Sequence, residues 1–94
     1  MAFILECLDR PDSLPLRLAN RPAHLAYIEA HLDRVIVAGP ILADDGTTPI
    51  GSLLILADDS RDAVEAFAAA DPYAKAGLFA TVTIRPWRKV FPAG

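Results

Sequence analysis

The chain has 94 residues, of which 53% are hydrophobic, and its 12 acidic and 9 basic side chains give a formal net charge of −3. This size predicts one small domain over residues 1–94, and the acidic balance without a Lys/Arg cluster disfavours a nucleic-acid-binding surface. No apolar run approaches the roughly 18 residues of a membrane span, and the start lacks the basic segment of a signal peptide, so we expect a cytoplasmic protein that does not enter a membrane.

The first predicted element is a β-strand over residues 2–8 (AFILECL), a short apolar run that the turn residues DRPD end. Strand alternation places three side chains on one buried face. They are Phe3, Leu5 and Cys7.

Two prolines, Pro15 and Pro22, interrupt the next stretch. Because proline is tolerated only in the first turn of a helix, we expect a short helix or turn near 13–20 and a firmer helix over about 22–33. Two stripes in this second helix have helical spacing. The stripe expected to face the core is Leu25, Ile28 and Leu32. The neighbouring stripe is His24, Tyr27 and His31.

Residues 34–42 (RVIVAGPIL) are rich in β-branched side chains and predict a strand. Pro40 restricts this strand to an edge or a bulge, because proline has no N–H to donate to a ladder. Turn residues at 43–49 and a second apolar run over 50–57 then predict a β-hairpin.

The last two elements are a helix and a strand. Ser60 or the aspartates before it can cap a helix that we expect to run to about Ala70, with Val64 and Phe67 as its main apolar contacts. Residues 78–87 (LFATVTIRPW) alternate apolar and more polar side chains, which predicts a half-buried strand.

The predicted order β-α-β-β-α-β is typical of an α+β, ferredoxin-like fold: a four-stranded antiparallel sheet with both helices on one face. The other face of the sheet then stays uncovered in a single copy. Since the chain is strongly apolar, we expect the same face of a second copy to cover it. The result would be a homodimer whose two sheets enclose a barrel-like space.

Several short motifs lie along the chain in order. They are RPAHL at 21–25, AGP at 38–40, GS at 51–52, ADPY at 70–73, GL at 77–78 and RPW at 85–87. Over about residues 2–91 this set resembles the YciI-like (YCII-related) proteins. The resemblance implies a dimeric α/β barrel related in fold to muconolactone isomerases and other small aromatic-pathway enzymes. It also implies an active site built on His24 and Asp71.

The chemistry of these two residues supports the same pairing. Asp71 precedes Pro72, which moves its backbone out of the helical region. Its carboxylate therefore either caps the following turn or serves a reaction, and His24 is either a half-exposed surface residue or part of a pocket wall. An imidazole ordinarily titrates near pH 6.5, and a carboxylate on one ring nitrogen would fix its tautomer. The pair predicts general acid/base chemistry.

Other side chains are candidates for contacting a small-molecule ligand. They are Arg21, Tyr27, Gly39, Pro40, Ser52 and Tyr73. Arg21 would either meet an anionic substrate or pair with Asp12 or Glu29. His31 is expected at the solvated surface, and Trp87 in the dimer contact.

Motifs for covalent catalysis, metals and cofactors are weak. Ser52 lacks the glycine elbow of a nucleophile, and the single Cys7 has no thiol partner, which fits a reducing cytoplasm. Two histidines seven residues apart do not specify a metal site, and the scattered glycines form no phosphate-binding loop. We therefore expect a cofactor-free isomerase or dehalogenating lyase acting on a small aromatic or lactone-like substrate. The alternative is a non-catalytic metabolite-binding or accessory domain of the same fold.

Overall fold

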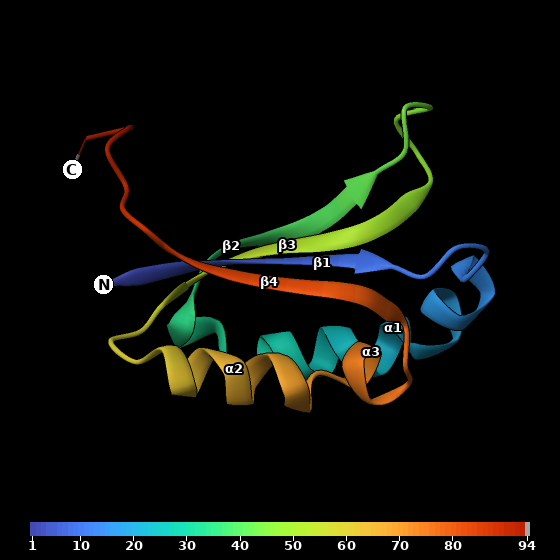
Figure 1. Ribbon diagram of the computed structural model, residues 1–94, viewed down its shortest axis with the longest axis horizontal. Helices are drawn as coiled ribbons and strands as arrows, with labels where there is room; N and C mark the ends of the chain where they lie inside the picture. The colour runs from blue at the N-terminus through green and yellow to red at the C-terminus, as the bar shows by residue number, and fades with distance from the viewer. Residues whose placement is uncertain (94) are drawn as a thin grey trace.

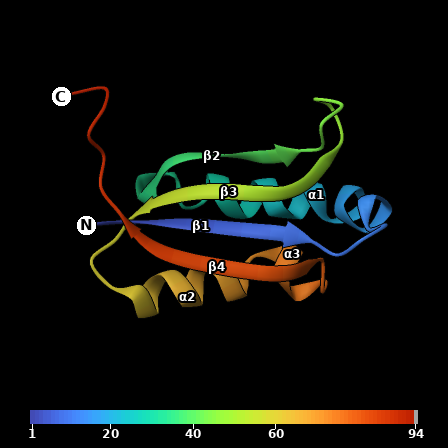
Figure 2. The same cartoon turned by 45° about the horizontal axis from the view of Figure 1, so that its top comes forward.

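The computed structural model describes residues 1–93 as one sheet with a layer of helices on one side (Figure 1). The elements are β1 (Ala2–Asp9), α1 (Leu14–Glu29), a short 3-10 helix (Leu32–Arg34), β2 (Val35–Leu42), β3 (Pro49–Ala57), α2 (Arg61–Ala70), α3 (Pro72–Lys75) and β4 (Phe79–Trp87). The sheet is antiparallel in the order β2-β3-β1-β4, and Figure 2 shows the helices behind it. This confirms the predicted ferredoxin-like fold. Gly94, the last residue of the predicted domain, lies outside the described residues.

The core lies between the two central strands, β1 and β3, and the helices. Phe3, Leu5 and Cys7 face the helices and are buried, as strand alternation predicted. The residues packed with them include Ile28, Leu54, Leu56, Val64 and Phe67. Burial raises the pKa of the Cys7 thiol to about 12. The thiol therefore stays protonated near neutral pH and is a poor nucleophile.

The hairpin and the second helix also follow the predictions. β2 is an edge strand, the position that Pro40 favours. α2 begins after Ser60, whose Oγ accepts a hydrogen bond from the backbone N–H of Ala63 at 3.3 Å. Val64 and Phe67 are both buried beneath the sheet.

The first helix differs from the prediction. A single helix α1 runs from Leu14 to Glu29 with Pro22 inside it, so the expected break near residue 20 is wrong. Pro22 removes one hydrogen bond, the one to the carbonyl of Leu18. The helix continues because side chains on both sides of the proline are anchored in the protein interior: Arg17 bonds Asp9 and Ser52, and His24 bonds Asp71.

The continuous helix also changes which stripe faces the sheet. Leu25 and Leu32 are 40% and 60% exposed, so the predicted core stripe is wrong except for Ile28. Leu32 lies beyond the end of α1 in the 3-10 helix. The inward side of α1 instead carries a mixed set of polar and apolar side chains, namely Arg17, His24, Tyr27 and Ile28.

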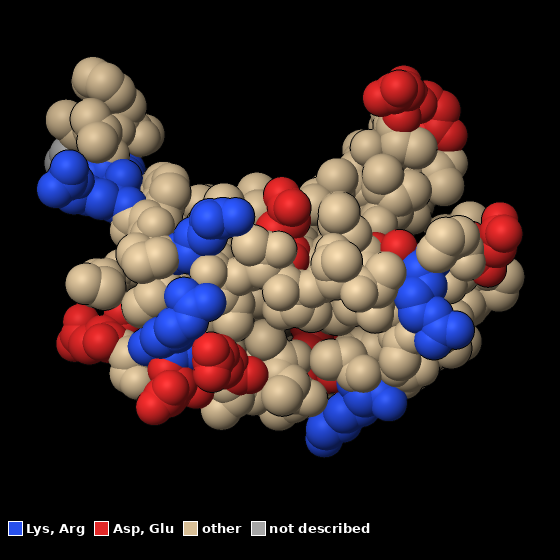
Figure 3. All heavy atoms as spheres, viewed as in Figure 1, with Lys and Arg blue, Asp and Glu red and all other residues tan. Residues whose placement is uncertain are grey.

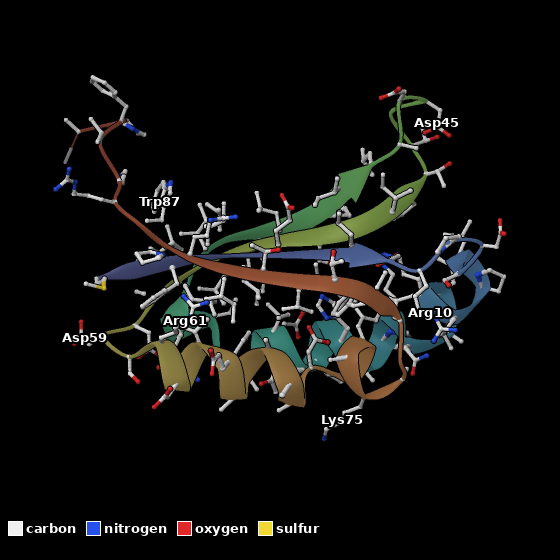
Figure 4. All side chains as sticks on the ribbon, viewed as in Figure 1. Arg10, Asp45, Asp59, Arg61, Lys75 and Trp87 are labelled. Carbon is white, nitrogen blue, oxygen red and sulfur yellow. The ribbon has the colours of Figure 1, made fainter. Side chains whose placement is uncertain are left out.

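The face of the sheet opposite the helices carries no covering element among residues 1–93 (Figures 1 and 3). Its side chains alternate with the core set, and they include Ile4, Glu6, Val37, Leu53 and Ile55. The C-terminal segment and the β2–β3 turn rise at its two ends and leave a hollow between them. Trp87 lies on this side of the sheet (Figure 4). In residues 1–93 no helix combines the length and the apolar character of a membrane span.

Candidate active site

A pocket of about 360 Å³ opens between α1, the β2–β3 hairpin and α3. Of the predicted ligand-contacting residues, its lining contains Arg21, Gly39, Pro40, Ser52 and Tyr73, together with His24. Leucine and isoleucine side chains form much of the remaining wall, including Leu25, which explains why that leucine is not in the core. A cavity of this size with a few polar groups on an apolar wall is typical of a site for a small molecule.

His24 and Asp71 are hydrogen-bonded at the wall of this pocket. Nδ1 of His24 lies 2.9 Å from Oδ1 of Asp71 and 3.0 Å from Oδ2. Both side chains are largely shielded from solvent, with exposed fractions of 12% and 6%. Because a carboxylate only accepts hydrogen bonds, we assign the ring proton to Nδ1, which leaves Nε2 of the neutral ring as an acceptor.

The backbone around Asp71 explains its position. Asp71 has extended dihedral angles (φ −60°, ψ 131°) and ends α2 while capping α3. Its Oδ1 accepts a hydrogen bond from the backbone N–H of Tyr73 at 2.9 Å, and Pro72 occupies the first turn of α3, where it needs no partner. The carboxylate thus caps the turn and contacts His24 at once, so the two predicted alternatives do not exclude each other.

Tyr73 holds the imidazole from one side. Its ring stacks on that of His24 with centroids 4.0 Å apart and an interplanar angle of 13°. The guanidinium carbon of Arg17 lies 4.7 Å from the centre of the Tyr73 ring. Burial raises the pKa of Tyr73 against the opposing charges of Arg17 and Arg21, so its phenol stays protonated at neutral pH.

Arg17 is the site residue that sequence reasoning missed. It is buried, and its Nη1 donates to both carboxylate oxygens of Asp9 at 3.0 Å while its Nη2 donates to Ser52 Oγ at 2.8 Å. Burial raises the pKa of Asp9, and the charge of Arg17 opposes this rise. The seven-residue spacing between Arg17 and His24 could have identified Arg17, because residues two helical turns apart lie on the same face of a helix. The predicted break near residue 20 hid that spacing.

Two predicted roles differ from what the structure shows. Tyr27 lies outside the pocket lining, and its hydroxyl donates to the carbonyl oxygen of Phe67 at 2.8 Å. His31 was expected at the solvated surface; its side chain is half-buried, and its ring centroid lies 4.6 Å from that of Tyr27 and 5.4 Å from that of Phe67. Its Nδ1 also lies 2.7 Å from the carbonyl oxygen of Tyr27. Both side chains close the far end of α1 against α2.

Charge in the pocket comes from arginine. Arg21 lines the cavity and forms no ion pair within residues 1–93, which leaves neither Asp12 nor Glu29 as its partner. No aspartate or glutamate contributes to the lining. Within the described part of the chain, no three His, Cys, Asp or Glu side chains gather in a group that could hold a metal ion.

The sheet order and the helical layer define a ferredoxin-like α+β protein with a pocket beside the His-Asp pair, the fold of the dimeric α/β-barrel proteins compared below. The chain belongs to the YCII-related domain family, which matches residues 1–88. It is 40% identical to Protein YciI from Escherichia coli O6:H1 over 97% of this chain and 100% of that protein.

Solved structures show the same relationship. 5-Chloro-2-hydroxyhydroquinone dehydrochlorinase (TftG) from Burkholderia phenoliruptrix AC1100, in complex with 2,5-dihydroxybenzoquinone, is 40% identical, with 94% of each chain covered and a TM-score of 0.87. An antibiotic biosynthesis monooxygenase at 12% identity and a TM-score of 0.55 shares the fold alone.

Proposed function

We propose that this protein is a small-molecule enzyme of the lyase type, in which His24 and Asp71 remove hydrogen halide from a small halogenated, hydroxylated ring without a cofactor. The observation that carries the proposal is the shielded 2.9 Å contact between the two side chains at the wall of a pocket. The 40% identity to a dehydrochlorinase supports elimination over isomerisation.

Loss of hydrogen halide from such a ring requires proton transfers from oxygen and to carbon, and one group that accepts and returns protons is sufficient for them. Nε2 of His24 first takes the proton of a ring hydroxyl and gives it to the halogen-bearing carbon, which turns that hydroxyl into a ketone. Nε2 then takes the proton of a second hydroxyl. The freed electron pair forms a second C=O bond, the ring double bond shifts, and halide leaves with the electrons of its bond to carbon. The products are a quinone, a halide ion and a proton, so the reaction consumes no oxidant.

Asp71 has two tasks in this scheme. Its hydrogen bond to Nδ1 holds Nε2 in the basic tautomer, and its charge stabilises the imidazolium that forms between the two proton transfers. Tyr73 limits rotation of the imidazole by stacking on it. The apolar wall excludes water from the ring, which strengthens these electrostatic interactions.

The direct test is halide release. The purified protein, incubated without oxygen with 5-chloro-2-hydroxyhydroquinone, should release chloride and form a quinone absorbance at equal rates, well above the rate without protein. Tyr27→Phe, which changes a tyrosine outside the pocket, should match the wild type. Binding of the compound without chloride release would contradict the lyase and favour the non-catalytic metabolite-binding alternative.

The proposed enzyme is a homodimer that buries the open face of the sheet. This face carries several apolar side chains together with the exposed Glu6, and charges of opposite sign lie at its two ends (Figure 3). The exposed Arg88 and Lys89 lie in the C-terminal segment, and the exposed Asp44 and Asp45 lie in the β2–β3 turn. Hydrogen bonds from Thr48 lower the pKa of Asp45 to about 2, so the turn stays negative at neutral pH.

This charge pattern selects one two-fold arrangement. An axis running across the strands brings the turn of each copy to the C-terminal segment of the other, so that opposite charges meet. An axis along the strands would bring like charges together, which disfavours that packing. Face-to-face contact of the two hollows is also what encloses a barrel-like space.

Charge reversal at the two ends tests this dimer. In sedimentation equilibrium at low salt, Asp44→Lys with Asp45→Lys should weaken the dimer, and so should Arg88→Glu with Lys89→Glu. A protein carrying all four changes should regain the wild-type dimerisation constant. A wild-type monomer, or a fourfold variant as weak as the twofold ones, would count against the arrangement.

A further inference from the structure

Two buried residues, Ser52 and Tyr73, place hydroxyl groups at the pocket that have no acceptor for their hydrogens among residues 1–93. Ser52 is 3% exposed and Tyr73 is 1% exposed, and both contribute to the pocket wall. The Ser52 Oγ takes part in one side-chain hydrogen bond, in which it is the acceptor. The Tyr73 hydroxyl is bonded to none of the described residues, although the backbone N–H of Tyr73 is bonded to Asp71. No fully buried side-chain nitrogen or oxygen of the described residues lacks a hydrogen-bond partner, so the unpartnered Tyr73 oxygen reaches the open space of the pocket, as a donor to a ligand must.

Arg17 determines how Ser52 presents its hydroxyl. A guanidinium only donates hydrogen bonds, so the 2.8 Å contact with Arg17 Nη2 uses Ser52 Oγ as an acceptor. The Ser52 hydrogen must therefore point away from Arg17. The guanidinium cannot move aside, because its Nη1 is held by both oxygens of Asp9. Ser52 is thus locked as a donor toward any group in the pocket.

Tyr73 is a donor for a different reason. Its phenol stays protonated because the ring is buried. Its ring cannot tilt freely, since it stacks on His24 and lies beneath the guanidinium of Arg17. Like Ser52, it offers a hydrogen from a fixed position and needs an acceptor.

The charge of the pocket indicates what that acceptor is. Arg21 lines the same cavity, forms no ion pair within residues 1–93, and acts electrostatically on the Tyr73 phenol. The lining contains no carboxylate that would compete for these donors. Two fixed hydroxyl donors and a free guanidinium in an apolar pocket are suited to an oxygen that carries negative charge.

We propose that Ser52, Tyr73 and Arg21 form a subsite for a deprotonated ring oxygen, an enolate or phenolate, with Arg17 as the positioning residue that fixes the Ser52 hydrogen. The inference rests on the proposed function, because it names the substrate class of the same pocket. The substrate enters as an anion whose charged oxygen is held by this subsite, and His24 takes the protons of the two remaining ring hydroxyls. The subsite stabilises the negative charge of the held oxygen without any rearrangement of the protein.

The test compares two probes that share one ring and differ in ionisable oxygens and in two added methyl groups. 2,5-Dihydroxy-1,4-benzoquinone has ionisable ring oxygens, and 2,5-dimethoxy-1,4-benzoquinone has the same ring without them. Calorimetric titration of the wild type should show at least tenfold tighter binding of the dihydroxy compound. Tyr73→Phe and Ser52→Ala should each lower this affinity ratio about tenfold, the effect of one hydrogen bond to a charged acceptor. Tyr27→Phe, which removes a hydroxyl outside the pocket, should leave the ratio unchanged.

The positioning role of Arg17 is tested by the affinity ratio of the two probes in two Arg17 variants. In Arg17→Gln the amide oxygen can take the Ser52 hydrogen, so the ratio should fall, whereas Arg17→Lys offers only donors and should keep it. A general loss of structure would weaken both probes alike and leave the ratio as it was. A wild-type ratio near one, or wild-type ratios in both Tyr73→Phe and Ser52→Ala, would overturn the subsite. Missing chloride release would instead contradict the lyase and leave these ratios intact.

Discussion

Replacing His24 with glutamine should lower the rate of chloride release by about 10³-fold, within the range that a positioned general base contributes. Glutamine can still donate a hydrogen bond to Asp71, but it cannot accept and return a proton at neutral pH. The fold should therefore survive while the chemistry is lost. Initial rates of chloride release, with a circular-dichroism melt of the same sample, measure both effects.

Two further variants separate the roles of the pair. His24→Ala should be as inactive as His24→Gln and should regain part of its activity when imidazole is added, because the substitution leaves space beside Asp71. Asp71→Asn should lose activity although His24 is still present, because the amide no longer fixes the tautomer. Wild-type rates in His24→Gln would remove the imidazole from the reaction and with it the proposed mechanism.

Replacing Arg17 with methionine should lower the free energy of unfolding by about 3–5 kcal/mol, the usual cost of removing one partner from a buried ion pair. The variant leaves the Asp9 carboxylate buried beside an apolar chain. It also removes the hydrogen bonds from Nη1 to Asp9 and from Nη2 to Ser52. Urea unfolding followed by circular dichroism gives the free energy directly.

The double variant Arg17→Met with Asp9→Asn is the matched control. With the buried charge removed it should regain much of the lost stability, because neutral replacements of a buried ion pair are often tolerated. The single variant should also become relatively more stable in acid. Burial raises the pKa of Asp9 in the folded protein, so the folded state binds the proton more tightly than the unfolded state does. The loss of unfolding free energy in the single variant is therefore smallest below the ordinary pKa of a carboxyl group. It grows as the pH rises through the raised pKa of Asp9 in the folded protein. A loss under about 1 kcal/mol would show that the pair contributes little to folding.

Strand alternation, helix capping and proline chemistry predicted the structure correctly wherever neighbouring residues in the sequence determine it. The alternation of Phe3, Leu5 and Cys7 predicted the buried face of β1, and the cap residues at 58–60 predicted where α2 begins, with Ser60 as the cap in the structure. Both depend on neighbours in sequence, because a strand has a fixed period and a helix terminus needs an acceptor close by. The edge position of β2 followed in the same way from Pro40, which lacks a donor.

The same short-range patterns gave a wrong prediction for α1, because residues distant in the sequence determine whether this helix continues past Pro22. The rule for proline correctly counts the hydrogen bond that Pro22 removes, but it does not count the anchors supplied by Asp9, Ser52 and Asp71. Those contacts come from β1, β3 and the α2–α3 junction, so they are invisible until the chain is folded. The wrong helix boundary at Pro22 led to two further errors. It separated Arg17 from the helix that carries His24, and it assigned Leu25 to the core.

The sequence by itself determined the order and type of most elements, the fold class and the motifs around His24 and Asp71, because these depend on periodicity, turn chemistry and short spacings. Only the tertiary structure decided that the imidazole meets a carboxylate 47 residues further along the chain at 2.9 Å, and that a buried arginine donates to the Ser52 hydroxyl oxygen. The physical reason is that such contacts depend on the packing of a helix against a sheet. That packing is set by the whole core and not by any one segment.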